Sequence, residues 1–159
     1  MKTLSGTMAV VALILAVGCG GSQLEKQAVD KATTAALEWL NLIDAAKYEE
    51  SWDKAASLFK IGVTKKRWVD TLTIVRKPLG EPVSRKLVKA EYLTSLPGAP
   101  DGEHVVLRFK TSFRHKYQAI ETVTPMLDKD GKWRKSHVVV GVFQAHSPCC
   151  VSRACSKAM

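Results

Sequence analysis

The chain has 159 residues, of which 46% are hydrophobic and 25% are charged, and its formal net charge is +9. This length fits one domain and leaves little room for two. The hydrophobic fraction is typical of a folded core and excludes a wholly disordered chain.

The first predicted element is an export signal over residues 1–18. Lys2 gives it a positive start, and residues 8–17 are an uninterrupted run of ten apolar side chains. Ten residues rise about 15 Å as a helix, about half the hydrocarbon thickness of a bilayer, so a secretion signal fits better than a spanning helix. Removal of the signal takes away only Lys2 of the 24 basic residues. The secreted chain therefore stays basic. A basic surface can bind nucleic acid, but a secreted protein does not meet it, so we expect no nucleic-acid partner.

The end of this signal, residues 15–19, reads LAVGC. It resembles the bacterial lipobox, in which a small residue precedes a cysteine that is lipidated and becomes the mature N-terminus. The resemblance implies a lipid anchor on Cys19 and a short tether over residues 19–25. Gly20 is similar to the residue found there in lipoproteins on the periplasmic face of the outer membrane. The alternative is an ordinary signal peptide, cut near Gly18 or Gly20.

The folded domain is predicted over residues 26–143 and opens with three helices. Apolar side chains at spacings of three and four predict these helices at about residues 28–43, 48–59 and 64–78. A break is expected at residues 45–47. Thr64 is of a type that caps helix N-termini, so the third helix is expected to begin there.

The period of the apolar side chains then changes to about 2, which predicts strands. Four strands are expected, over residues 83–96, 105–114, 118–128 and 133–143. Pro125 limits the third strand to an edge or a bulge, and Asp130-Gly131 predicts a hairpin turn before the fourth. Three helices followed by four strands predict an α+β domain, with three N-terminal helices packed on a four-stranded antiparallel sheet.

Five sequence blocks occur in order within residues 26–135. They are WLNLID at 39–44, YEESW at 48–52, RKPLG at 76–80 followed by SR at 84–85, ETVT at 121–124 and GKWR at 131–134. Together they resemble a bacterial family of small secreted proteins, catalogued as domain of unknown function 4019. The family brings no reaction with it. The arrangement is also similar, by analogy, to the cone-like domains of the nuclear-transport-factor-2-like group.

Domains of this cone-like shape sometimes hold an acid or a base at the bottom of an apolar cup. The candidates here are Asp44, Tyr48, Glu91 and His137. An inward carboxylate or imidazole with a shifted pKa would suit a small enzyme of the isomerase or dehydratase kind. The alternative is that Asp44 caps the second helix and that Tyr48 is a partly buried core residue.

A basic face is predicted on the second strand, where Arg108, Lys110 and Arg114 point outward. Such a face suits an acidic component of the envelope, namely lipid headgroups or cell-wall polymer, and the alternative is a solvated surface. His104 and His115 flank this strand and are expected to be exposed. The sequence has no phosphate loop and no recognisable triad, so we expect no cofactor. A non-catalytic envelope lipoprotein that binds a partner, or a small apolar ligand in the cup, is the preferred interpretation.

Residues 144–159 form an irregular tail that holds three of the four cysteines. The spacing of Cys149, Cys150 and Cys155 does not match a structural zinc site, even with His146, so no metal is expected. In an oxidising compartment one disulfide would join Cys155 to Cys149 or Cys150. A shifted reading frame near the end of the gene would also produce such a tail.

Overall fold

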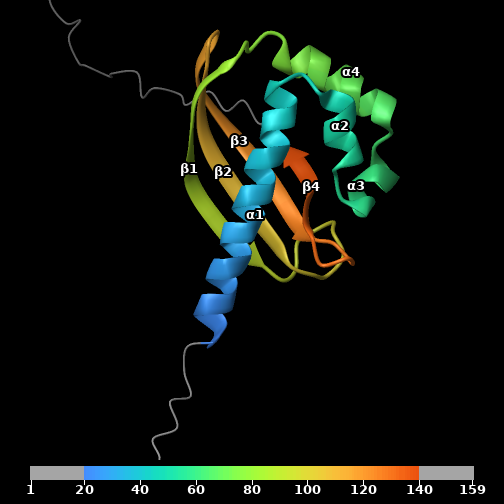
Figure 1. The fold of residues 1–159 in the computed structure, drawn as a ribbon, viewed down its shortest axis with the longest axis vertical. Helices are drawn as coiled ribbons and strands as arrows, with labels where there is room; N and C mark the ends of the chain where they lie inside the picture. Colours follow the sequence, from blue (N-terminus) through green and yellow to red (C-terminus); the bar gives the residue numbers. More distant parts are fainter. Residues whose placement is uncertain (1–19, 140–159) are drawn as a thin grey trace, which may run out of the picture.

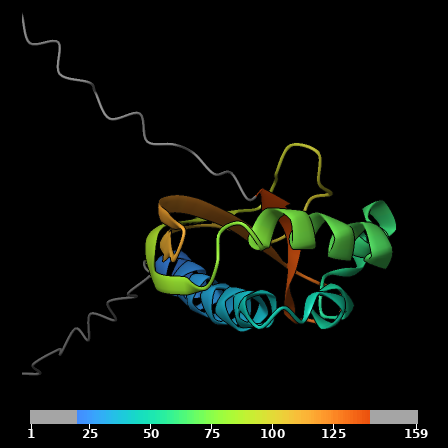
Figure 2. The ribbon, with the colours of Figure 1, turned by 90° about the horizontal axis from the view of Figure 1, so that it is seen from above.

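The computed structural model describes residues 20–139 of the chain, with side chains from residue 23 to residue 136. It confirms an α+β domain with one four-stranded antiparallel sheet, in the order β1-β2-β3-β4 (Figure 1). The long helix α1 lies along one face of the sheet, and α2 follows near its end (Figure 2). No helix within the described residues is long and apolar enough to cross a membrane.

The described helices number four, so the predicted count of three is wrong. They are α1 (Gly20–Asp44), α2 (Tyr48–Asp53), α3 (Ser57–Gly62) and α4 (Lys65–Arg76). The helix expected over residues 48–59 is divided because Ala56 has an extended backbone and donates its N–H to the carbonyl oxygen of Lys135 on β4, at 2.8 Å. This tertiary hydrogen bond replaces one that a continuous helix would make.

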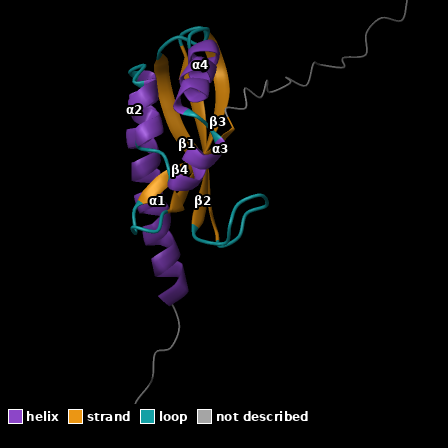
Figure 3. Ribbon diagram, turned by 90° about the vertical axis from the view of Figure 1, so that its right-hand side faces the viewer, coloured by secondary structure: helices purple, strands orange, loops and turns teal. Residues whose placement is uncertain are grey.

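The predicted helix boundaries at residues 45–47 and at Thr64 are confirmed. Ala46 has a φ of 57°, which ends the path of α1 and turns the chain toward α2. The Thr64 hydroxyl accepts a hydrogen bond from the backbone N–H of Arg67, as an N-cap does. At the other end, α1 already includes residues 20–25, for which we expected a tether, and its first turns extend beyond the sheet (Figures 1 and 3).

The strands are β1 (Pro82–Leu93), β2 (His104–Phe113), β3 (Lys116–Leu127) and β4 (Trp133–Val139). Pro125 lies in an interior strand, and the pairing of β3 with β4 shifts register between Thr124 and Pro125, so the predicted bulge is confirmed. Strand β2 ends one residue earlier than expected. The backbone N–H groups of Arg114 and His115 donate to Glu81 and Leu79, and these bonds turn the chain toward β3.

The core lies between the helices and the inner face of the sheet. Alternate residues of β2 point into it, and they meet aromatic and aliphatic side chains from α1, α3 and α4. Its buried members include Trp39, Ile43, Phe59, Trp68, Leu72, Val105, Leu107, Phe109 and Val123. Burial of side chains of this size contributes about 1.5–3 kcal/mol each, so this cluster supplies much of the driving force for folding.

Candidate functional site

Four charged side chains from four elements form a buried ion-pair network on the inner face of the sheet. Arg76, at the end of α4, donates to Asp44 at 2.5 Å and to Glu121 at 2.7 Å. Arg85, on β1, donates to the same two carboxylates, at 2.7 Å to Asp44 and at 2.8 Å to Glu121. The side chain of Arg76 is 7% exposed and that of Glu121 only 3%. We call Asp44, Arg76, Arg85 and Glu121 the ion-pair network.

The surroundings of the network keep its charges in place. Burial alone would raise the pKa of Glu121, but hydrogen bonds from Arg85 and Thr111 and the nearby guanidinium charges bring it below its ordinary value. Burial opposes the charge on Arg85 as well, and its bonds to the two carboxylates nevertheless raise its pKa. Two acids and two bases cancel in charge, so the network joins α1, α4, β1 and β3 without leaving a free acid or base.

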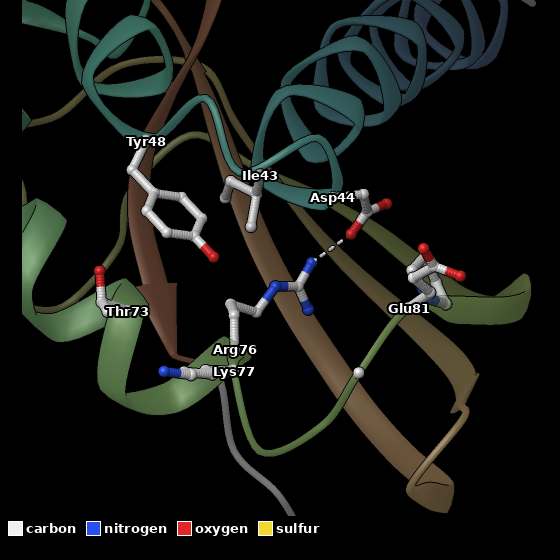
Figure 4. A pocket seen from close by; sticks show the side chains of 9 residues that line it. Ile43, Asp44, Tyr48, Thr73, Arg76, Lys77 and Glu81 are labelled. Carbon is white, nitrogen blue, oxygen red and sulfur yellow. Dashed lines mark hydrogen bonds and ion pairs between the residues drawn. The ribbon is translucent and has the colours of Figure 1, made fainter.

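Asp44 and Tyr48, two of the predicted cup residues, line a cavity of about 290 Å³ beside this network (Figure 4). The Tyr48 hydroxyl points toward Arg76 across the cavity, while the Asp44 carboxylate is engaged by the two arginines. The N-cap of α2 is Lys47 rather than Asp44. The cavity is close to the lower size limit of a small ligand site, but Asp44 and Arg76 on its wall are already paired with each other.

The other two candidates lie elsewhere. Glu91 is exposed on β1 and pairs with Lys89 at 2.8 Å, and that hydrogen bond lowers its pKa. The backbone of His137 lies in β4 opposite Thr124, but its side chain is outside the described residues. His115 is exposed as expected, whereas His104 is buried and its Nε2 lies 3.1 Å from the carbonyl oxygen of Pro100.

The outer face of the sheet carries a cluster of cations on two neighbouring strands. Arg108 and Lys110 are exposed on β2, as predicted from their alternation. The antiparallel register places Lys89 opposite Arg108 and Lys86 opposite Lys110, and both β1 lysines are exposed. We call Lys86, Lys89, Arg108 and Lys110 the basic outer face.

Arg114 does not belong to this face, because it lies in the turn after β2 and is 3.8 Å from Glu81. Sequence reasoning did not find the two β1 lysines. The pairing of β1 shifts register between Leu87 and Lys89, so the strand has no regular alternation that would assign them to the outer face.

Lys135 is a second feature that sequence reasoning missed. Its ammonium nitrogen Nζ lies 3.6 Å from the ring centre of Phe59, 3.8 Å from that of Trp68 and 4.5 Å from that of Trp39. The residue is only 3% exposed, and Nζ has no hydrogen-bond partner. Burial lowers the pKa of Lys135 to about 6. An available signal was the position of Lys135 two residues after Trp133, which places both on the same face of β4.

Among the side chains of residues 23–136, no group of three or more His, Cys, Asp or Glu is arranged to hold a metal ion. Cys19 and the tail residues His146, Cys149, Cys150 and Cys155 lie outside the described part of the chain, as does the predicted signal over residues 1–18. The predictions about lipidation, disulfides and the tail therefore stay predictions.

No curated protein and no solved structure matches the chain. The family described as "Protein of unknown function (DUF4019)" matches residues 35–137, a span that contains the ion-pair network, the basic outer face and Lys135. The resemblance noted from the five sequence blocks is confirmed. The match covers more than half of the chain, and the protein therefore belongs to the DUF4019 family.

Proposed function

We propose that this protein is a lipid-anchored cell-envelope protein whose domain binds an anionic surface, without catalysis, through the basic outer face. The observation that carries the proposal is the placement of four exposed cations at facing positions of β1 and β2. The basic outer face could therefore contact several anionic groups at once, if these groups lie in one plane.

The pairing of like charges supports a binding role. Lys86 faces Lys110 and Lys89 faces Arg108, and like charges directly opposite each other destabilise a sheet. Glu91 is close enough to Lys89 and Arg108 to feel both charges, and it offsets part of the repulsion. An anionic surface would relieve the rest, and basic residues close to an acidic membrane contribute about 1 kcal/mol each.

The partner that fits best is the headgroup layer of the membrane that holds the anchor. Helix α1 begins at Gly20, directly after the predicted lipidated Cys19, so the domain would stay close to that membrane. An attached surface is present at high effective concentration, and weak contacts of this kind then suffice. Cell-wall polymer is the competing partner, and the test below distinguishes the two.

The other candidate, a small isomerase or dehydratase with an acid or base in an apolar cup, has weaker support. The inward carboxylates Asp44 and Glu121 are both held by two arginines, and proton transfer by either would break the ion-pair network. Binding of a small apolar ligand in the cavity beside Tyr48, without turnover, remains compatible with these contacts.

The lipid anchor is tested in cells by labelling with radioactive palmitate. We expect the wild-type chain to be labelled and the Cys19→Ala variant to carry no label. Equal labelling of the two chains would show that Cys19 is not the acylated residue. The labelling result concerns the anchor alone, because the basic outer face does not include Cys19.

The binding face is tested with the unlipidated chain that starts at Gly20 and contains the whole described fold. We expect it to sediment with vesicles that contain phosphatidylglycerol and not with pure phosphatidylcholine vesicles. Exchange of all four cations of the basic outer face for glutamine should weaken binding at least tenfold.

The matched control exchanges four exposed lysines elsewhere for glutamine, namely Lys31, Lys66, Lys77 and Lys129. The control has the same net charge as the test variant, so a loss confined to the test variant would locate the site. Equal losses in both would reduce the effect to net charge and overturn the proposal. Binding to purified cell-wall polymer but not to vesicles would replace the membrane with the polymer as partner.

A further inference from the structure

Lys135 is the only buried lysine among the residues whose side chains are described. A buried lysine is expensive to keep charged unless a carboxylate or other acceptor compensates it. No acceptor in the described part of the chain lies within hydrogen-bond or ion-pair distance of its Nζ. A hydrogen bond or ion pair within the described residues therefore does not explain why this amine is buried.

Three aromatic rings surround this amine, one each from α1, α3 and α4. Trp39 and Trp68 lie 5.8 Å apart between ring centres, and Phe59 and Trp68 meet in a T-shaped arrangement with 5.1 Å between ring centres. Both indoles are held by Ser51 on α2, because Trp39 donates to its carbonyl oxygen at 2.8 Å and Trp68 to its hydroxyl at 2.9 Å. We call Trp39, Phe59 and Trp68 the aromatic cage.

Lys135 connects the sheet to these helices twice. Its side chain enters the aromatic cage, and its carbonyl oxygen accepts the hydrogen bond from Ala56 that separates α2 from α3. The helices α2 and α3 are six residues each, which is too short for either to be stable without tertiary contacts. A change in the state of Lys135 is therefore transmitted directly to this part of the helical layer.

A second cavity lies beside Lys135 and is large enough to receive its ammonium group. It has a volume of about 390 Å³ and is lined by Trp39 and Lys135, which also belong to the cage region. Its other charged lining residues are Glu38, Asp53, Lys54, Lys132 and Arg134. A lysine has a flexible stem of four carbons, so its charged end can move from apolar surroundings to a nearby polar site.

We propose that Lys135 is an acid-sensitive latch, whose neutral amine sits in the aromatic cage and whose protonated form moves toward this second cavity. In the latched state, β4 is connected to α1, α3 and α4. In the released state, the ammonium reaches water and the carboxylate of Glu38, because Asp53 is already paired with Lys65 at 2.7 Å. Helix α3 is then less firmly held on β4.

The groups around the amine set the direction of the response. The side chains that face Nζ from α1, α3 and α4 are the neutral rings of the cage, and Ser51 on α2 is occupied by the indoles. Proton uptake is thus governed by burial, which lowers the pKa of Lys135 to about 6. The ring faces attract an ammonium and oppose part of this shift. Acid favours the released state, because only that state holds the proton readily.

The test follows amide hydrogen exchange, corrected for its intrinsic pH dependence, in the chain that starts at Gly20. With a latched-state pKa of about 6, a fall from pH 7 to pH 5 should raise the open population of Ser57–Gly62 about tenfold. Lys135→Met removes the charge at similar length, so its exchange should not respond to this change. Lys129→Met, in the exposed turn between β3 and β4 and outside the cavity lining, should respond as the wild type does.

A direct titration keeps the proposal falsifiable even if Lys135→Met does not fold. Carbon-13 NMR of the lysine side chains in the wild-type chain should show one amine that titrates near pH 6. The absence of any lysine titration near pH 6 in the wild type would overturn the latch. So would an acid response of equal size in wild type and Lys135→Met.

Discussion

Arg76 is a buried charge that connects helix α4 to both α1 and β3. It donates to carboxylates from α1 and β3, and its guanidinium lies 5.0 Å from the ring centre of Phe113. Replacement of the arginine would leave Asp44 and Glu121 with Arg85 as their one cationic partner among the described residues, and the desolvation of both carboxylates would be less well compensated. The network is therefore more sensitive to loss of one member than to exchange of the whole set for apolar groups.

We predict that Arg76→Met lowers the free energy of unfolding by about 3–5 kcal/mol, because it breaks a buried pair from one side. Urea denaturation at pH 7 measures the change. Lys66→Met is the control, since Lys66 pairs with Asp70 in full contact with solvent and its loss should leave the urea midpoint unchanged. A loss below about 1 kcal/mol in Arg76→Met would show that the network contributes little.

At the scale of elements, the connection between α1 and α2 contains a strained backbone conformation at Ala46. Ala46 has a φ of 57°, in the left-handed region where the Cβ atom of an L-residue is crowded. The turn is nevertheless retained, because it brings Trp39 on α1 next to Ser51 on α2. The position is one where glycine would suit the backbone better than alanine.

We predict that Ala46→Gly stabilises the domain by about 0.5–1 kcal/mol, since relief of the left-handed strain exceeds the extra entropy of glycine in the unfolded chain. Thermal unfolding should show a rise in Tm. Ala45→Gly is the matched control, because Ala45 does not have a positive φ, and it should lower Tm. A fall in Tm for both variants would mean that the turn carries no strain.

The division between α2 and α3 belongs to the same scale. Periodicity alone favours one helix over residues 48–59, and the observed break depends on the bond from Ala56 to a strand that lies far along the chain. Local pattern predicted the helical nature of the segment correctly. The break could not be predicted, because it depends on which backbone groups the sheet leaves available.

For the whole molecule, Lys135 should dominate the response of stability to pH in the neutral and alkaline range. The folded state binds a proton with a pKa of about 6, whereas an unfolded lysine binds it up to about pH 10. Between these values the unfolded state holds more protons, so stability rises with pH by about 1.4 kcal/mol per unit. The cost of burying the amine is complete at and below pH 6 and disappears toward pH 10.

We predict this rise for the wild type and a flat profile for Lys135→Met, measured by urea denaturation at pH 6, 7, 8 and 9. Lys129→Met is again the control, because it removes an exposed charge from the turn between β3 and β4 and should keep the wild-type slope. A wild-type stability that is independent of pH across this range would contradict the prediction.

The basic outer face leads to a second prediction at this scale, about the salt dependence of binding. If the basic outer face holds headgroups, binding of the unlipidated chain to phosphatidylglycerol vesicles should disappear between 0.1 M and about 1 M NaCl, as the screening length falls from about 10 Å to about 3 Å. Co-sedimentation across a salt series measures this. Binding that survives high salt would point to apolar contacts instead.

Features encoded by neighbouring residues were available from the sequence alone. The change of period from helix to strand, the Thr64 cap, the bulge at Pro125 and the five family blocks each depend on side chains a few positions apart. They are determined locally, because capping and the alternation of faces are set by the local backbone. The α+β class and the family followed from them.

Only the tertiary structure placed Arg76 against Glu121 and Lys135 inside three rings from three helices. It also placed Lys86 and Lys89 opposite the cations of β2. A register shift in β1 interrupts the alternation of side chains, so the sequence pattern does not assign these lysines to the outer face. These arrangements join residues many positions apart, and they depend on strand register and helix packing, which no local pattern specifies. The residues proposed here for function belong mainly to this second group.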